Sequence, residues 1–233
     1  MKIPRTQKGF TLIELLVVIG IIALLASIAV PAFVGVQVKA AQTKALSNAK
    51  QIGLACATFA IDNNGQYPNY QASSTGTGTT TATYAYQVFN NLFPIYLTTV
   101  QVFYQAKSQN TPNPMTDPTT ASMQAGTALT TGNNEWSYVT GLYNTSSSTL
   151  PLIASGFNAV APGSCTYSNN ENARGGVWKG ANAVVVFCDT SARVMKCNSS
   201  YEVIGSVTAD EFDTTGGGTT PWLTSANTVL MPW

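Results

Sequence analysis

A single carboxylate, Glu14, lies inside a long apolar run. The run extends from Phe10 to Val30, and Glu14 is its one ionisable residue. A carboxylate within a membrane helix costs on the order of 3 kcal/mol, and no Lys or Arg lies inside the run to pair with it. A cut between Gly9 and Phe10 would create an α-amine four residues before Glu14. Because a neighbouring molecule shifted along its axis could present this amine to the carboxylate, the pattern indicates assembly.

The sequence offers few residues for catalysis or metal binding. The 233 residues include no His, which removes the commonest general base and the commonest metal ligand. His-dependent triads and His-bearing zinc sites are therefore excluded. Ser47 and Lys50 match the Ser-x-x-Lys pattern of serine acylases, but the accompanying Lys-Thr-Gly is missing, so we interpret the match as chance. We expect no enzyme, no catalytic residue and no cofactor.

One acidic cluster near the C-terminus could bind a metal ion. Asp210, Glu211 and Asp213 could supply oxygen ligands to Ca²⁺. We interpret the cluster as a solvated acidic turn and predict no metal site, although the sequence leaves calcium binding open.

The overall charge argues against a nucleic-acid partner. Only 9% of the residues are charged, and the net charge is +1. A protein that binds the phosphate backbone needs a basic surface. We therefore expect no nucleic-acid binding.

The N-terminal run is long enough to cross a membrane. As a helix its 21 residues would extend about 32 Å, against a hydrocarbon core of roughly 30 Å. Lys2, Arg5 and Lys8 precede it, so the N-terminus should stay cytoplasmic and the rest of the chain should face the exported side. The run is longer than a secretory signal, and the residues after it make a poor cleavage site. The simplest interpretation is a signal anchor that holds a soluble domain.

A family resemblance favours a more specific interpretation. Residues 8 to 19, with the sequence KGFTLIELLVVI, closely resemble the prepilin motif of type IV pilins and type II secretion pseudopilins. The resemblance extends over residues 1 to about 61. It is specific because a basic leader, a Gly-Phe junction, a lone Glu and a long apolar run all coincide.

The resemblance implies a processing pathway. A prepilin peptidase would cut between Gly9 and Phe10 on the cytoplasmic side, and the new amine of Phe10 would be N-methylated. Removal of residues 1–9 leaves 8 basic and 10 acidic residues, a net charge of −2. In the filament, Glu14 would pair with the N-terminal amine of a neighbour.

The implied function is that of a structural subunit of a helical filament. Its partners would be copies of itself and related pilins, the prepilin peptidase and methylase, an inner-membrane assembly platform and, before assembly, membrane lipid. It would lie in a bacterial inner membrane as a single-pass protein and then in a periplasmic or extracellular filament. A minor or adhesive pilin remains an alternative, and the sequence does not choose between a pilus, a secretion pseudopilus and DNA uptake.

The chain divides into a leader (1–9), a membrane and assembly helix (10–30), an amphipathic stalk helix (31–61) and a globular head (62–233). Pro31 should bend the helix, and with the weak helix former Gly20 it marks a stretch that could partly melt when subunits pack. A stripe at spacings of three and four predicts packing of the stalk on the head. Its members are Ala45, Ala49, Ile52, Cys56 and Phe59.

The predicted fold class is α+β, in which the long N-terminal helix packs on a small antiparallel sheet with long polar loops. Residues 62–68 should end the helix, because Asn and Gly suit a left-handed cap and Pro prevents continuation. A short helix is expected within 88–97. Strands are expected at 136–142, 152–157, 183–188 and 192–197, and the last two should form a hairpin.

Four cysteines fall on the predicted exported side, where disulfides can persist. A hairpin closed by residues 189–192 would place Cys188 opposite Arg193 and Cys197 opposite Val184, too far apart in register to bond each other. We therefore expect Cys165 to pair with either Cys188 or Cys197. The other of these two would pack or pair with Cys56.

Overall fold

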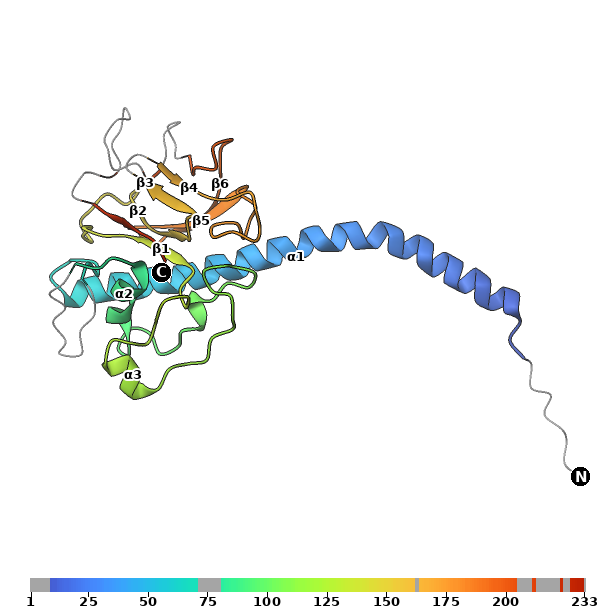
Figure 1. The fold of residues 1–233 in the computed structure, drawn as a ribbon, viewed down its shortest axis with the longest axis horizontal. Coiled ribbons are helices and arrows are strands. Elements are labelled where there is room, and N and C mark those ends of the chain that lie inside the picture. The colour runs from blue at the N-terminus through green and yellow to red at the C-terminus, as the bar shows by residue number, and fades with distance from the viewer. Residues whose placement is uncertain are drawn as a thin grey trace, which may run out of the picture. The chain divides into compact units, whose positions relative to one another are not determined.

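The structure is a computed structural model. It describes residues 9–70, 81–161, 164–204, 211–212, 223 and 227–232 of the chain. The chain divides into two compact units, residues 1–43 and 44–233. Helix α1, Leu12–Asp62, contributes to both of them (Figure 1).

In the first unit, α1 begins directly after Thr11 and continues through Gly20 and Pro31 without a break. Its segment Leu12–Val30 is long and apolar enough to cross a membrane, by length and composition, and none of it is buried within the structure. This agrees with the predicted apolar helix.

The second unit, which we call the head, contains the carboxyl-terminal part of α1 and a five-stranded antiparallel sheet in the order β6-β5-β2-β1-β7. A separate antiparallel pair is formed by β3 and β4. The fold class is therefore α+β, as predicted. The strands are β1 Trp136–Val139, β2 Pro151–Ser155, β3 Ala159–Ala161, β4 Ser164–Thr166, β5 Asn182–Phe187, β6 Ala192–Lys196 and β7 Val229–Leu230.

Short helical segments connect α1 to the sheet. The expected helix within 88–97 is found earlier and shorter, because Pro94 cannot continue it. The segments are α2 Ala85–Phe89, η1 Asn90–Leu92, η2 Gln101–Phe103 and α3 Thr120–Gln124. The end of α1 is as predicted: Asn64 and Gly65 adopt positive φ, and the Gly65 amide donates to the Ala60 carbonyl at 2.8 Å.

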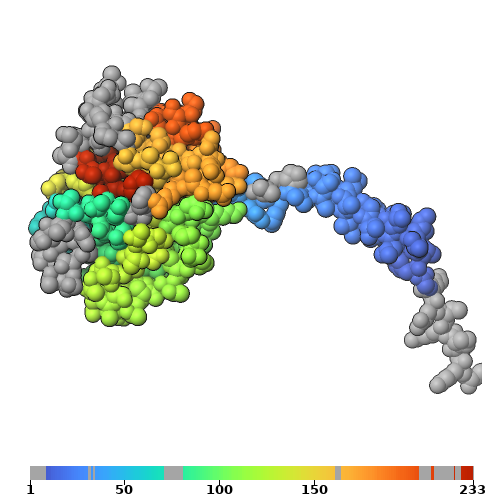
Figure 2. Space-filling model, in the orientation of Figure 1, coloured from blue at the N-terminus to red at the C-terminus, as the bar shows by residue number. Residues whose placement is uncertain are grey.

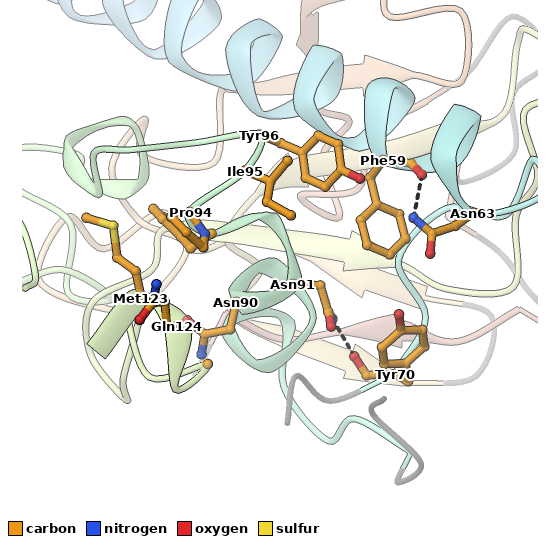
Figure 3. A pocket seen from close by; sticks show the side chains of 12 residues that line it. Phe59, Asn63, Tyr70, Asn90, Asn91, Pro94, Ile95, Tyr96, Met123 and Gln124 are labelled. Carbon is orange, nitrogen blue, oxygen red and sulfur yellow. Dashed lines mark hydrogen bonds between the residues drawn. The ribbon is translucent and has the colours of Figure 1, made fainter. Parts of the chain in front are cut away.

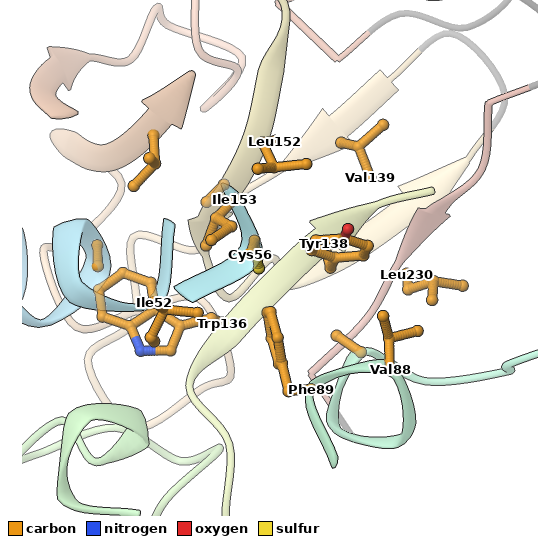
Figure 4. Close-up of a cluster of buried hydrophobic side chains, with 14 of the residues drawn as sticks. Ile52, Cys56, Val88, Phe89, Trp136, Tyr138, Val139, Leu152, Ile153 and Leu230 are labelled. Atoms are coloured by element: carbon orange, nitrogen blue, oxygen red, sulfur yellow. The ribbon is translucent and has the colours of Figure 1, made fainter. Parts of the chain in front are cut away.

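The predicted apolar stripe forms the contact between α1 and the sheet. Ala45, Ala49, Ile52, Cys56 and Phe59 are all at most 5% exposed. Figure 4 shows Ile52 and Cys56 beside Trp136, Tyr138 and Ile153, three buried side chains of β1 and β2. The 3.6-residue period of the stripe is what allows one face of the helix to be covered by the sheet.

Gly53 brings α1 closest to the sheet. A Cβ added at Gly53 would lie 2.7 Å from Cγ1 of Val186, a fully buried residue of β5. Real carbon atoms do not approach so closely, and the stiff β-branched valine cannot easily move aside. At this point the backbone of the helix at Gly53 therefore packs directly against the Val186 side chain of the sheet.

We expect Gly53→Leu to destabilise the head by about 1 to 3 kcal/mol, the usual cost of overpacking a core. Gln51→Leu adds the same side chain at an exposed position of the same helix, so it controls for the presence of an added leucine on α1. Thermal unfolding of both variants checks the prediction, and equal melting temperatures for the two variants would contradict it.

The hairpin of β5 and β6 is present, but the predicted register is wrong by three residues. Val185 pairs with Arg193 and Val184 with Val194, so the chain reverses around Asp189. The physical reason is an Asx turn: the Asp189 carboxylate accepts a hydrogen bond from the Ser191 amide at 2.8 Å, and Thr190 adopts a left-handed φ of 64°. The turn chemistry thus decides the register.

The cysteines are thiols in this structure, and no disulfide joins them. Cys188 lies in the hairpin turn and Cys197 follows the far end of β6, whereas Cys165 belongs to β4. Burial raises the pKa of Cys188 to about 12 and raises the pKa of the fully buried Cys56 as well. Both thiols are therefore neutral and weakly nucleophilic in the folded head.

Candidate functional site

The Thr11-x-x-Glu14 segment forms a reciprocal cap at the start of α1. The backbone amide and the hydroxyl of Thr11 donate to Oε2 of Glu14 at 2.8 and 2.6 Å. In return, the Glu14 amide donates to the Thr11 hydroxyl at 3.3 Å. These bonds make a capping box. It provides hydrogen-bond acceptors for backbone amides that have no partner inside the first turn of a helix.

The capping box gives Glu14 partners within its own chain, which the interpretation of a lone carboxylate did not predict. The missed residue is Thr11, and the Ser/Thr-x-x-Glu signature ahead of an apolar run was the available signal. Within the described residues, both side-chain bonds end on Oε2 of Glu14. Its Oε1 thus remains able to accept a hydrogen bond from another molecule.

The surroundings of Glu14 are apolar and open. A depression of about 360 Å³ is lined by Phe10, Ile13, Glu14, Val17 and Val18. Phe10 is 77% and Ile13 70% exposed, and in Figure 2 the dark blue segment of α1 stands uncovered by the rest of its own unit. A carboxylate at the edge of an exposed apolar surface suits a cationic partner that also brings apolar side chains.

Of the other predicted site residues, two precede helix α1 and two lie inside it. Gly9 and Phe10 are exposed and precede the helix, so the peptide bond between them is not protected by helical hydrogen bonds. Gly20 lies inside α1, and a side chain there would meet nothing within 4 Å. Pro31 also lies inside α1, more than four turns from Glu14, so the structure does not bring these positions together.

A second carboxylate of note is Glu135, which is fully buried in the head. Ser108 Oγ donates to its Oε2, and Asn110 Nδ2 lies 3.3 Å from the same oxygen. The Gly156 amide also donates to the carboxylate. Burial raises the pKa of Glu135 to about 7, although these three hydrogen bonds act to lower it.

An unsatisfied acceptor lies beside Glu135. Oδ1 of Asn110 is buried and has no hydrogen-bond partner in the described part of the chain. A half-turn of this amide would bring Oδ1 to the carboxyl group, where it could accept the proton of a neutral Glu135. In the observed orientation it is burial, and not the hydrogen bonds, that favours the protonated carboxyl group.

The predicted acidic turn is not fully solvated. Glu211 is only 3% exposed, and its amide donates to the Val203 carbonyl at 2.9 Å, so the solvated interpretation is wrong for this residue. Asp210 and Asp213 lie outside the described residues. Among the residues that are described, no group of three His, Cys, Asp or Glu side chains is placed to hold a metal ion.

Comparison with known proteins finds a family match at the N-terminus. Residues 4–30 match the family described as "Prokaryotic N-terminal methylation motif". The chain is 45% identical over 64 residues to the type II secretion system core protein G of Aeromonas hydrophila, and 41% identical over 68 residues to the protein of the same name from Escherichia coli K12. It is also 45% identical over 56 residues to the type IV major pilin protein PilA of Myxococcus xanthus.

These similarities cover a limited part of each protein. They span 24 to 29% of this chain. The chain covers 44 and 46% of the two secretion proteins and 25% of the pilin. No solved structure matches the chain significantly. The family match, at residues 4–30, covers the N-terminal region that contains Gly9, Phe10 and Glu14.

Proposed function

We propose that the N-terminal region is that of the type IV pilins and type II secretion pseudopilins. From this premise, the chain is a structural subunit of a helical filament. The observation that carries the proposal is the start of α1: an exposed Gly9–Phe10 bond, a capped Glu14 with one open oxygen, and an apolar helix that its own chain leaves uncovered.

Processing would create the assembly surface. A cut between Gly9 and Phe10 removes three basic residues and places an α-amine at the start of the apolar helix. The helix itself is retained, unlike the apolar segment of a secretory signal. N-methylation of Phe10 keeps this amine basic, so it remains a cation that a carboxylate can bind.

Assembly would join the amine of one subunit to Glu14 of the next. Each subunit then gives its amine on one surface and receives another on a different surface. Such a contact is heterologous and repeats without closing, which generates a helical filament. The apolar side chains around Glu14 would exclude water from the contact and strengthen the ionic interaction.

The membrane would store the subunit before assembly. The helix would span a bacterial inner membrane with its N-terminus in the cytoplasm, because three basic residues precede it. The head would lie on the exported side. The partners of this pathway would be a prepilin peptidase and methylase, an inner-membrane assembly platform, membrane lipid and further pilin-like subunits.

The processing step can be tested directly. We expect protein purified from its native membrane to begin at N-methylated Phe10, as measured by intact mass and N-terminal sequencing. Gly9→Val places a branched side chain at the cut bond and should leave the precursor uncut. Gly20→Val, at another glycine with open space around it, should be processed normally. A chain that begins at Met1 or after Val30 would refute the proposal.

A further inference from the structure

The head contains a pocket of about 480 Å³ that the assembly proposal does not use. Its volume lies within the roughly 300 to 1,000 Å³ of small-molecule sites. The end of α1, the turn after η1 and the end of α3 form its walls (Figure 3).

The floor of the pocket is aromatic. Phe59 and Phe93 are 5 and 6% exposed. The ring of Tyr96 meets Phe59 edge to face with centroids 5.6 Å apart, and Tyr70 lies at 6.5 Å from Phe59 on the other side. These rings belong to separate segments of the chain, and their mutual packing holds them in place.

The walls of the pocket carry amide groups in place of charged side chains. The twelve residues that line it include four with side-chain amides and none with a charge; the amide residues are Asn63, Asn90, Asn91 and Gln124. Asn90 exchanges two hydrogen bonds with the backbone of Leu129, at 2.7 and 3.0 Å, and so fixes the wall beside α3.

Asn91 presents an acceptor. Its Nδ2 donates at 2.8 Å to the backbone carbonyls of both Tyr70 and Val88, which occupies the two amide hydrogens. Among the described residues no hydrogen bond is found to its Oδ1, which is left to accept one. The ligand should therefore bring hydrogen-bond donors and an apolar face, and it should be uncharged.

We propose that this pocket binds a neutral saccharide. A pyranose ring has an apolar face that can pack on Tyr96, and its hydroxyl groups can donate to the Asn91 amide oxygen. Ile95, 78% exposed at the rim, adds an apolar contact for a second sugar unit. A proline-rich peptide would also pack on aromatic rings, but its prolines lack the N–H donors that the amide oxygens require.

The test uses the full chain in detergent and does not depend on filament formation, so its outcome is separate from that of the assembly proposal. We would titrate the protein by calorimetry with maltose, cellobiose, lactose and chitobiose, and with a proline-rich peptide. At least one disaccharide should bind at millimolar concentration or tighter. If none binds, or if only the peptide binds, the proposal is wrong.

Variants locate the binding. Tyr96→Ala removes a stacking ring and should weaken binding about tenfold or more, a change of about 1.4 kcal/mol. Ile95→Ala, at an exposed position where folding is not at risk, should weaken it by a smaller factor. Tyr143→Ala, at a tyrosine 46% exposed outside the pocket, should leave the affinity unchanged. Equal effects of Ile95→Ala and Tyr143→Ala would place the binding elsewhere.

Discussion

Glu14→Ala is expected to reduce the number of filaments by about 100-fold or more while the protein still enters the membrane. Without the carboxylate, the amine of a neighbour would be buried in apolar surroundings unpaired, and breaking a buried ion pair in this way costs about 3 to 5 kcal/mol. The isolated helix becomes more apolar and thus more compatible with the bilayer. Counting sheared filaments by electron microscopy, with membrane-bound protein measured in parallel, checks both parts.

The capping box demands a control, because Glu14 also stabilises the start of its own helix. Glu14→Gln retains a side-chain oxygen that can accept from the Thr11 amide, and Gln serves in capping boxes as Glu does. It lacks the negative charge. If charge pairing drives assembly, Glu14→Gln should be as defective as Glu14→Ala.

Thr11→Ala provides the complementary variant. It removes the hydroxyl of the capping box but keeps the carboxylate and the Thr11 backbone amide bond. We expect helix stability to fall by about 1 kcal/mol and filaments to remain. If Glu14→Gln formed normal filaments and Thr11→Ala formed none, capping and not the intersubunit contact would explain the requirement for Glu14.

The head should lose stability as the pH rises from about 4.5 to 7, because of Glu135. Its pKa is raised from 4.5 to about 7 in the folded protein. Between these values the unfolded chain has released the proton while the folded head retains it, so a rise in pH favours unfolding. The contribution is present in full below pH 4.5 and is lost above pH 7. It amounts to about 3 kcal/mol at 1.36 kcal/mol per unit of pKa.

Glu135→Gln isolates this contribution. After a half-turn of the Asn110 amide, the neutral Gln amide can donate to Oδ1 of Asn110, which has no hydrogen-bond partner in the described part of the chain. The Gln side chain carries no charge at any pH. We expect the variant to be more stable than the wild type at pH 8 and close to it at pH 4.5. Urea unfolding at both pH values measures the difference in unfolding free energy between the variant and the wild type. The contributions of the other titrating groups are the same in both proteins and cancel. A difference that does not change with pH would contradict the buried-acid interpretation.

Much of the architecture could be predicted because it follows from local periodicity. The spacing of Ala45, Ala49, Ile52, Cys56 and Phe59 identified the buried face of the helix, and each of these side chains is buried in the head. The four predicted strands are those with dense β-branched or aromatic residues. β7 has two residues, Val229 and Leu230, and forms by pairing with β1, so a local pattern could not reveal it.

The registers and the buried polar groups required tertiary structure. The reversal at Asp189 depends on a side-chain bond within the turn, which shifted the pairing by three residues from the position that the hydrophobic pattern indicated. The raised pKa of Glu135 depends on burial by distant segments, and its position in the sequence gives no sign of that burial.

The N-terminal site divides in the same way. The sequence alone determined where the lone carboxylate, the Gly-Phe junction and the apolar helix lie, because these are properties of neighbouring residues. The structure decided which oxygen of Glu14 is already occupied and which remains open. It also brought Phe59, Tyr70, Asn91, Tyr96 and Gln124 around one pocket. These five residues are spread over more than sixty positions, and only the packing of α1 against the segments that follow it brings them together.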